Sequence, residues 1–289
     1  ENIQYFDGLG RPIQTISKSQ APEGKDIITH IEYDALGRQP KDYLPYVNGN
    51  GSLNFRPDAG TNTQNFYVNK FGDSQAFSEK RIEQSPLNRV FRQGAPGTPW
   101  NVDNGNPVRF EYHANSNEDQ VIKIKVTLDA SYNPTYSIVG NYPENTLYKN
   151  IVFDENGNKS EEFKNVKGQI ILKRNFVREG NTLKPLNTYY VYDDFDNLTL
   201  VLPPNFPVNS SNISNDERRS FLAYEYRYND KNLLVYKRLP GKRYEEFVYD
   251  NKNRLIGSSN VYSPNTGIQN NTWYYTFYDD FNRIKYTGN

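Results

Sequence analysis

The sequence predicts an all-β protein built from stacked antiparallel β-hairpins. A motif recurs eight times in the 289 residues: an aromatic residue is followed by a short polar turn of nearly fixed length. In front of most copies, aromatic or branched residues alternate with polar ones, a period of two that places them on one face of a strand. A second apolar run follows the turn, as in 198–202. Each copy is therefore typical of a strand, a turn and a second strand.

The residues of the turn explain its chemistry. An Asp or Asn after the aromatic residue accepts N–H groups from residues further on, and a Gly or Asn three positions later tolerates the left-handed conformation of a tight turn. The aromatic positions are Phe6, Tyr33, Phe153, Phe163, Tyr192, Tyr228, Tyr249 and Tyr278. The next position holds Asp7, Asp34, Asp154, Asp193, Asn229, Asp250 or Asp279, whereas the copy at Phe163 has one extra residue before its Gly168. The left-handed position holds Gly10, Gly37, Gly157, Asn232, Asn253 or Asn282.

An arginine ends four of the turns and is expected to lie back toward the Asp carboxylate. These arginines are Arg11, Arg38, Arg254 and Arg283. As exposed pairs they are expected to contribute at most ~1 kcal/mol each. A single hairpin cannot bury an aromatic face, so the units must stack, and we expect the motif tyrosines to be largely buried between neighbouring hairpins.

The chain divides into three segments. Residues 1–46 hold the first hairpin units, 47–150 form a non-repeat β-rich insert, and 151–289 return to repeats. The insert contains a strand-like run over 120–128. One short helix is expected among the later repeats, where Ser214 and Glu217 form a capping-box pattern ahead of Phe221.

Composition excludes several classes of protein. With 34 basic and 34 acidic residues the net charge is zero, which argues against nucleic acid or an anionic membrane as partner. Cys is absent, which excludes disulfides and thiol chemistry. No apolar run approaches the ~18 residues of a membrane-spanning helix. The chain starts at Glu1 without a signal peptide and contains no Met, so it is interpreted as an internal fragment or a processed product.

No catalytic, cofactor-binding or metal site is predicted. The only histidines, His30 and His113, lack metal-ligand spacing and are expected to be structural or on the surface. The acidic run 154–158 departs from a calcium loop and is interpreted as a hairpin turn. The pairs Asp193/Asp194 and Asp279/Asp280 occupy the turn of the repeat, where neighbouring residues do not share a face. No serine lies in the setting of a nucleophile elbow.

The repeats resemble the tyrosine-aspartate (YD) repeats of the Rhs family. The stretch 5–46, YFDGLGRPIQTISKSQAPEGKDIITHIEYDALGRQPKDYLPY, resembles the opening of Rhs-like secreted proteins of Bacteroidetes, as does 85–100, SPLNRVFRQGAPGTPW. The stretch 224–241, YEYRYNDKNLLVYKRLPG, resembles another segment of these proteins, with Asn229 and Leu233 departing from the usual Asp and Arg. The resemblance implies a spiral β-sheet that forms a hollow shell around a C-terminal toxin. The self-cleaving Asp-Pro motif of the family has no counterpart here, because the sequence contains no Asp-Pro pair.

The resulting prediction is a non-enzymatic, cofactor-free wall segment of a secreted or cell-surface shell. Its expected partners are further YD repeats and the effector of its parent chain, together with secretion machinery. The alternative is a surface adhesin in which Trp100, Trp273 and exposed tyrosines stack on sugars. A hydrolase has no support in the sequence. The first two readings differ in where the aromatic side chains lie, buried between hairpins or grouped on an outward patch.

Overall fold

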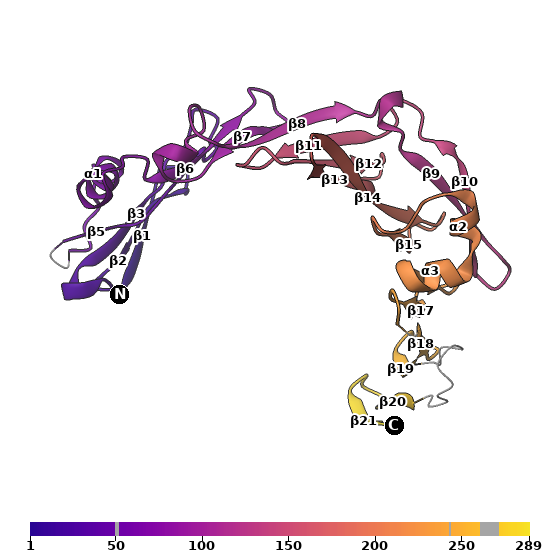
Figure 1. Cartoon of the computed structure of the whole chain (residues 1–289). Helices are drawn as coiled ribbons and strands as arrows, with labels where there is room; N and C mark the ends of the chain where they lie inside the picture. The colour runs from indigo at the N-terminus through magenta and orange to yellow at the C-terminus, as the bar shows by residue number, and fades with distance from the viewer. Residues whose placement is uncertain (50–51, 243, 261–271) are drawn as a thin grey trace. The chain divides into compact units, whose positions relative to one another are not determined.

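The computed structural model describes residues 1–49, 52–242, 244–260 and 272–289, and its regular structure is mostly antiparallel β-sheet with a few short helices (Figure 1). The chain forms two compact units. Unit 1 comprises Glu1–Glu111 with Ile151–Lys159, and unit 2 comprises Tyr112–Asn150 with Ser160–Asn289. The predicted all-β fold class is confirmed.

Unit 1 contains a small antiparallel sheet covered by a helix. Its strand order is β1 (Asn2–Phe6), β2 (Pro12–Ser17), β3 (Asp26–His30) and β5 (Tyr46–Asn48). Helix α1 (Ala59–Phe71) packs against β3 and β5, and ends where Gly72 adopts a left-handed conformation with φ of 72°. The fully buried side chains of Ile16, Ile28 and Tyr46 meet Ala59 of the helix, and this contact forms the core of the sheet.

A second run of antiparallel strands follows in unit 1. It joins β4 (Lys41–Tyr43), β6 (Phe77–Ile82), β7 (Val90–Gly94) and β8 (Val108–Ala114) in that order. Strands β8 and β11 (Tyr148–Phe153) each continue from one unit into the other along the chain. Three single-turn 3-10 helices occupy loops: η1 (Pro22–Gly24), η2 (Thr98–Trp100) and η3 (Asn117–Asp119).

Unit 2 contains a long meander in which every strand pairs with the next one in the chain. Its strands are β12 (Lys159–Lys164), β13 (Ile170–Glu179), β14 (Thr182–Tyr192), β15 (Leu198–Leu202), β16 (Tyr224–Tyr228), β17 (Leu234–Arg238), β18 (Tyr244–Tyr249), β19 (Leu255–Asn260), β20 (Thr272–Tyr278) and β21 (Ile284–Gly288). All pairings are antiparallel. The repeats predicted from 163 onward thus stack as consecutive hairpins.

One face of the meander is covered by a layer from elsewhere in unit 2. The hairpin of β9 (Ile122–Leu128) and β10 (Pro134–Asn141) lies beside β14 and β15, together with α2 (Ser210–Ser214) (Figure 1). Phe163, Leu172 and Leu200 are fully buried beneath this layer. The Tyr136 hydroxyl of β10 donates to the carbonyl of Thr199 at 3.1 Å. The strand-like run predicted over 120–128 is thus β9.

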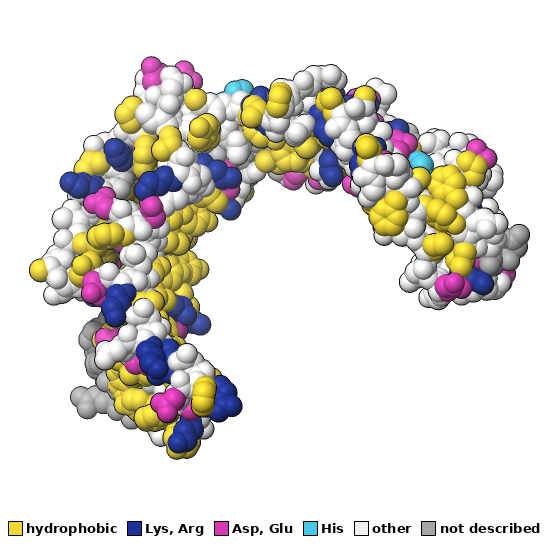
Figure 2. Space-filling model, turned by 180° about the vertical axis from the view of Figure 1, so that it is seen from behind, with side chains coloured by type: hydrophobic (Ala, Val, Ile, Leu, Met, Phe, Trp, Pro, Cys, Tyr) yellow, Lys and Arg dark blue, Asp and Glu magenta, His cyan; other side chains and the backbone are white. Residues whose placement is uncertain are grey.

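The cover ends near β16. By register, Tyr275, Phe277 and Tyr286 continue the face that holds Phe163, yet they are 46%, 57% and 57% exposed. Hydrophobic side chains gather in a band along the limb of unit 2 that ends at the C-terminus (Figure 2). The face of the meander that forms the hydrophobic core in the first hairpins is therefore an exposed apolar surface in the last hairpins.

The predicted helix is present as two short ones, but its capping residue is corrected. Helices α2 and α3 (Asp216–Leu222) are each capped by an Asn: the side chain of Asn215 accepts the N–H of Arg218. Ser214 does not cap α3, because its hydroxyl donates to the Ser210 carbonyl within α2. Helix α1 was not predicted. No helix in the described parts of the chain is long and apolar enough to cross a membrane.

Candidate functional site in the repeat turns

Each repeat turn closes on its own aspartate or, in two copies, on Asn165 or Asn229. In the first copy, Oδ1 of Asp7 accepts the N–H groups of Leu9 and Arg11, both at 2.9 Å, and Oδ2 accepts Nε of Arg11 at 2.8 Å. The Gly10 N–H donates to the Asp7 carbonyl at 3.0 Å, and Gly10 has φ of 75°. The backbone N–H of Arg11 is the main cause that lowers the pKa of Asp7 below its usual value. Both oxygens of the Asp7 carboxylate are thus occupied by hydrogen bonds that stabilise the turn.

The same geometry recurs in the other turns. Asp34, Asp250 and Asp279 accept the backbone N–H and Nε of Arg38, Arg254 and Arg283, respectively. An Asn replaces the Arg in two turns, where Asn158 donates to Asp154 at 2.8 Å and Asn197 donates to Asp193 at 3.1 Å. Turns form at Asp7–Gly10, Asp34–Gly37, Asp154–Gly157 and Asp250–Asn253, as the sequence predicts. The Asp154 segment is a hairpin turn rather than a calcium loop, since its Oδ1 accepts two backbone N–H groups.

The copy at Tyr33 forms the turn without a regular hairpin. A single isolated bridge, Ile31 to Asp42, flanks it. Strand β3 pairs with β2 and β5, whereas β4 pairs with β6. Pro40 lacks an N–H and cannot extend the ladder after the turn. This copy therefore links two runs of strands in unit 1, which corrects its interpretation as strand, turn and strand.

A tyrosine hydroxyl connects each of three turns to the preceding hairpin. Tyr33 donates to the carbonyl of Pro12 at 3.0 Å, Tyr249 to Leu234 at 2.9 Å, and Tyr278 to Leu255 at 3.1 Å. Each acceptor stands six residues after the aromatic residue of the preceding copy, which is Phe6, Tyr228 or Tyr249, respectively. The contact is specific for tyrosine, because phenylalanine has no hydroxyl to donate.

The expected burial of these tyrosines is corrected. Tyr33, Tyr192, Tyr228, Tyr249 and Tyr278 are all half-buried. In unit 2 they lie, by register, on the face opposite to the one that β9, β10 and α2 cover. Their rings pack against a neighbouring hairpin while one side stays open to solvent.

Side chains also link one turn of unit 2 to the next, along the edge where the turns lie. In every link the acceptor is the residue in the left-handed conformation of the following turn. We call this series the turn ladder; its rungs are Lys167 to Asp196 at 2.6 Å, Asn197 to Asn232 at 3.0 Å, Lys231 to Asn253 at 3.2 Å, and Arg254 to Asn282 at 2.9 Å. The acceptors have φ of 68°, 57°, 62° and 63°. Asn or Asp at this position therefore serves two purposes, the turn and the rung.

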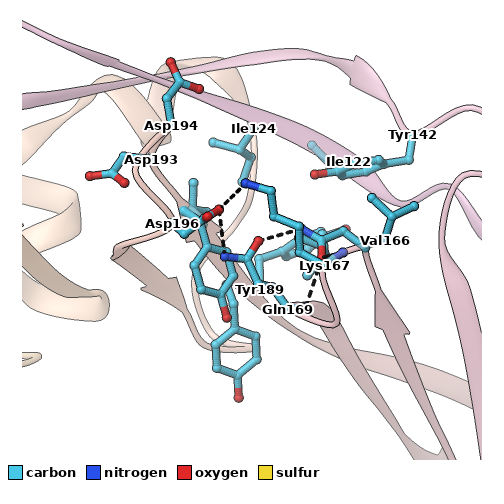
Figure 3. A pocket seen from close by; sticks show the side chains of 15 residues that line it. Ile122, Ile124, Tyr142, Val166, Lys167, Gln169, Tyr189, Asp193, Asp194 and Asp196 are labelled. Carbon is cyan, nitrogen blue, oxygen red and sulfur yellow. Dashed lines mark hydrogen bonds and ion pairs between the residues drawn. The ribbon is translucent and has the colours of Figure 1, made fainter.

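The first rung borders a cavity of about 250 Å³, drawn in Figure 3. Lys167 and Gln169 both donate to Oδ1 of Asp196, while Ile122 and Ile124 of β9 and Tyr142 line another part of the cavity (Figure 3). The amine and the carboxylate that meet here are already paired with each other. The cavity offers no nucleophile and base in hydrogen-bond contact among the residues that line it.

The motif arginines do more than close their own turns. The guanidinium of Arg254 lies 4.6 Å from the ring centroid of Tyr278 in the next copy, and Arg11 lies 4.3 Å from that of Tyr33. Arg38 donates to Oδ1 of Asn88 at 3.1 Å. The side chains of Arg38 and Arg254 are only 18% and 22% exposed. The expectation of exposed pairs is wrong for these arginines because the next turn covers them, and it holds for Arg283, which is 75% exposed.

A glycine at the left-handed position has its own reason in one turn. A Cβ on Gly37 would lie 3.0 Å from Nη1 of Arg11, and Gly37 has φ of 76°. A side chain there would displace the arginine that stacks on Tyr33. Glycine at this position therefore leaves room for the arginine side chain of the preceding turn, whereas asparagine at the same position of the turn ladder accepts a hydrogen bond from it, as Asn282 does from Arg254.

Two further turns of the same kind were not predicted. In Asp129–Asn133, Oδ1 of Asp129 accepts the N–H groups of Ser131 and Asn133, and Tyr132 holds the left-handed position with φ of 61°. In Ile82–Val90, Glu83 takes the place of the aspartate and binds Arg89 at 2.8 Å. The first of these turns has the sequence LDASYNP. It differs from the motif in two positions, because an aliphatic residue stands at the aromatic position and a tyrosine at the left-handed one, and it was therefore not recognised as a repeat turn.

A groove of about 280 Å³ lies between this new turn and the last hairpins. It is lined by Tyr132 and Asn133 from the β9–β10 turn, and by Arg227, Glu246 and Trp273 from the meander. Arg227 donates to the Asn133 side chain at 3.3 Å. The left-handed conformation is energetically unfavourable for a bulky residue such as Tyr132, and it places Tyr132 in the lining of this groove.

The predicted candidates for other chemistry lie apart from these features. Nε2 of His30 is 3.6 Å from a Glu32 carboxylate oxygen and its ring packs edge-on against Tyr43. His113 is exposed on β8, and Trp100 is 41% exposed in η2. Within the described residues, no cluster of three or more His, Asp or Glu is arranged to hold a metal ion.

Comparison with known proteins agrees with the fold. Residues 1–114 match a family described as a domain of unknown function, DUF6443, and the match ends close to the end of the first stretch of unit 1. No curated protein matches the chain. Among solved structures, the crystal structure of TcdB2-TccC3 is similar over 89% of this chain, at 12% identity and a TM-score of 0.54. The chain spans 11% of that protein's length.

A crystal structure of TcdB2-TccC3-Cdc42 is similar over 96% of this chain, with 13% identity, a TM-score of 0.47 and 13% of that chain covered. At these identities the likeness concerns the fold alone. The likeness to TcdB2-TccC3 agrees with the β-rich fold that the sequence predicts.

Proposed function

We propose that this chain is a structural, non-enzymatic segment of a YD-repeat wall. The observation that carries the proposal is the coupling of consecutive hairpins at two levels beyond the strand ladder. A tyrosine hydroxyl binds the preceding hairpin, and the turn ladder binds the following turn. Such contacts fix the register and spacing of neighbours, as a continuous wall requires.

The wall is proposed to enclose or deliver an effector carried by the same parent chain. The fold likeness to TcdB2-TccC3 supports a role of the shell type. The exposed apolar band of the last hairpins also supports it, because apolar surface of this kind is normally covered by a partner. Secretion or display at the cell surface, and origin in a Bacteroidetes-type Rhs protein, belong to the same proposal.

Limited proteolysis of the full parent chain tests the enclosed effector. We expect the region that follows the repeats to resist protease in the wild-type chain. In an Arg38→Ala/Arg254→Ala variant, which loosens two contacts between turns, the same region should become sensitive. An exposed lysine on the last strand, Lys285→Ala, is the control and should leave protection unchanged. Equal sensitivity of the effector region in all three chains contradicts enclosure.

We also propose that this chain has no catalytic activity. The turn carboxylates are occupied by backbone N–H groups, as in Asp7 and Asp250, and His30 packs on Tyr43. We expect no turnover of glycans, peptides or esters, and no change of melting temperature on chelation. Hydrolysis that disappears in a His30→Ala or His113→Ala variant would overturn this proposal.

The groove beside Trp273 supports adhesion to a glycan as a second candidate. Tyr132 and Trp273 offer aromatic faces, and Arg227 and Glu246 offer charged groups suited to sugar hydroxyls. Binding to a panel of immobilised glycans tests it. A glycan whose binding is lost in Trp273→Ala but kept in Trp100→Ala supports adhesion, and a panel without any binding removes this candidate.

A further inference from the structure

We infer that the C-terminal edge of unit 2 is a docking site for one further hairpin whose turn holds Asn or Asp in the left-handed conformation and whose first strand ends in tyrosine. The inference rests on the proposed function, since it names the chemistry of the next element of the wall. It is carried by the comparison of Arg254 with Arg283, which occupy the same position in consecutive copies.

Arg254 shows what a completed junction contains. Its Nε binds Asp250 in its own turn at 2.7 Å, and its Nη1 donates to the carbonyl of Asp279 at 3.4 Å and to Oδ1 of Asn282 at 2.9 Å. Its guanidinium also covers the ring of Tyr278. Tyr278 in turn donates its hydroxyl to the carbonyl of Leu255.

Arg38 repeats this junction in unit 1. Its Nη1 donates to the carbonyl of Glu83 at 2.8 Å and to Oδ1 of Asn88 at 3.1 Å. Asn88 has φ of 53°, so here too the acceptor is the left-handed residue of the following turn. The junction is therefore a property of the motif and not of one location.

Arg283 has only half of this environment. Its Nε binds Asp279 at 2.7 Å and its guanidinium stacks on Phe281, and both partners belong to its own turn. Its side chain is 75% exposed, against 22% for Arg254. Among the described residues, nothing from another turn contacts it.

The backbone beside Arg283 completes the site. Ile284 stands six residues after Tyr278, the position whose carbonyl accepts a tyrosine hydroxyl in the earlier copies. All five residues of β21 are exposed, and Ile284 and Tyr286 are 63% and 57% exposed. The occupant is thus defined by three features: a strand antiparallel to β21, a tyrosine at its end, and an Asn or Asp acceptor in its turn.

Binding of a hairpin peptide to residues 1–289 tests the site. The peptide is a head-to-tail cyclised copy of residues 272–288, which carries both the tyrosine and the acceptor Asn. Cyclisation is needed because an isolated two-stranded hairpin is marginally stable. Affinity is measured by fluorescence anisotropy, with circular dichroism as a check that every peptide forms a hairpin.

We expect replacement of the peptide's acceptor Asn by Gly to weaken binding about five-fold, the effect of one partly exposed hydrogen bond. Gly adopts the left-handed conformation more readily than Asn, so the loss is not due to a weaker turn. In an Arg283→Ala protein, the Asn and Gly peptides should bind equally. Lys285→Ala removes a neighbouring positive charge and should keep the five-fold preference. Arg283→Lys should keep part of it, since lysine can also donate to an Asn side chain but lacks the planar guanidinium of arginine.

Two outcomes overturn the inference: no binding of the Asn peptide at millimolar concentration, or an Asn preference that persists in Arg283→Ala. A second measurement covers poor behaviour of the peptide. In a chain extended by a second copy of residues 261–289, the amides of β21 should exchange with solvent at least ten-fold more slowly than in the original chain. Either failure leaves the proteolysis test of the parent chain intact, because a wall can continue through a different hairpin. Loss of effector protection in that test, in contrast, leaves docking at this edge unaffected.

Discussion

Replacing Arg254 with Ala separates the turn ladder from the ion pair within a turn. Arg283→Ala is the matched variant, because both arginines bind the aspartate of their own turn and that loss is common to the two. Arg254 alone donates to Asn282 at 2.9 Å, a partly exposed hydrogen bond from a charged group that contributes about 1 kcal/mol. Each arginine also lies over an aromatic ring, Tyr278 for Arg254 and Phe281 for Arg283, so the loss of a cation–π contact is common to the two variants. We therefore expect Arg254→Ala to cost about 1 kcal/mol more than Arg283→Ala, from the hydrogen bond to Asn282.

Native-state hydrogen exchange is the suitable assay. The chain has two compact units, so one denaturation curve does not define a single unfolding free energy. Exchange of the β19 and β20 amides reports the local free energy of opening, and about 1.4 kcal/mol corresponds to a ten-fold change in rate. Arg254→Ala should accelerate exchange of these amides about five-fold relative to Arg283→Ala. Equal acceleration by the two variants would show that the contact to the next turn has no energetic weight.

Three further outcomes are expected. Tyr249→Phe should destabilise the surrounding hairpins by about 1 kcal/mol, whereas Tyr278→Phe, whose hydrogen bond is exposed, should cost less, as measured by the same exchange assay. Gly37→Ala should cost more than the ~1 kcal/mol of left-handed strain, because its Cβ would meet Arg11; an equal loss in an Arg11→Ala background would contradict this contact. Bonds from the Arg89 side chain lower the pKa of Glu83 to about 2, so its stabilisation is present above pH 4.5 and is lost as pH falls toward 2; a Glu83→Gln variant should show a shallower acid transition by circular dichroism.

The turns could be predicted because their structure is local. Asp7 and Gly10 act within five residues, and the residue types alone indicate the bonds they make. The link from Tyr249 to the preceding hairpin follows the same spacing, yet its acceptor is a backbone carbonyl that no residue type marks. The rungs of the turn ladder depend on which turns become neighbours. Sequence shows the donors and acceptors but not their pairing.

The burial of the aromatic residues and the presence of helix α1 could not be predicted from local sequence patterns. The sequence placed Phe163 at the aromatic position of a repeat, but Asn165 closes this turn by accepting the N–H groups of Lys167 and Gln169, so Phe163 stands two residues before the turn residue. It therefore lies on the face that the distant β9–β10 hairpin and α2 cover and is fully buried, whereas Tyr228 stands directly before Asn229, lies on the opposite face and is half-buried. Helix α1 has the sequence AGTNTQNFYVNKF, which is poor in strong helix formers, and packing on β3 and β5 compensates for this. Tertiary context, which no local pattern records, decides both.

The origin of the cover layer sets an order of events during synthesis. Hairpins from β16 onward contact mainly their neighbours in the chain, so each can dock as soon as it leaves the ribosome. The β9–β10 hairpin is made earlier but has to wait for β15: the partner of Tyr136 is Thr199, 63 residues later. At ~5–20 residues per second, that interval is about 3–13 s. During this time the core around Val126 and Tyr136 is incomplete, because Leu200 and Leu202 belong to the same cluster.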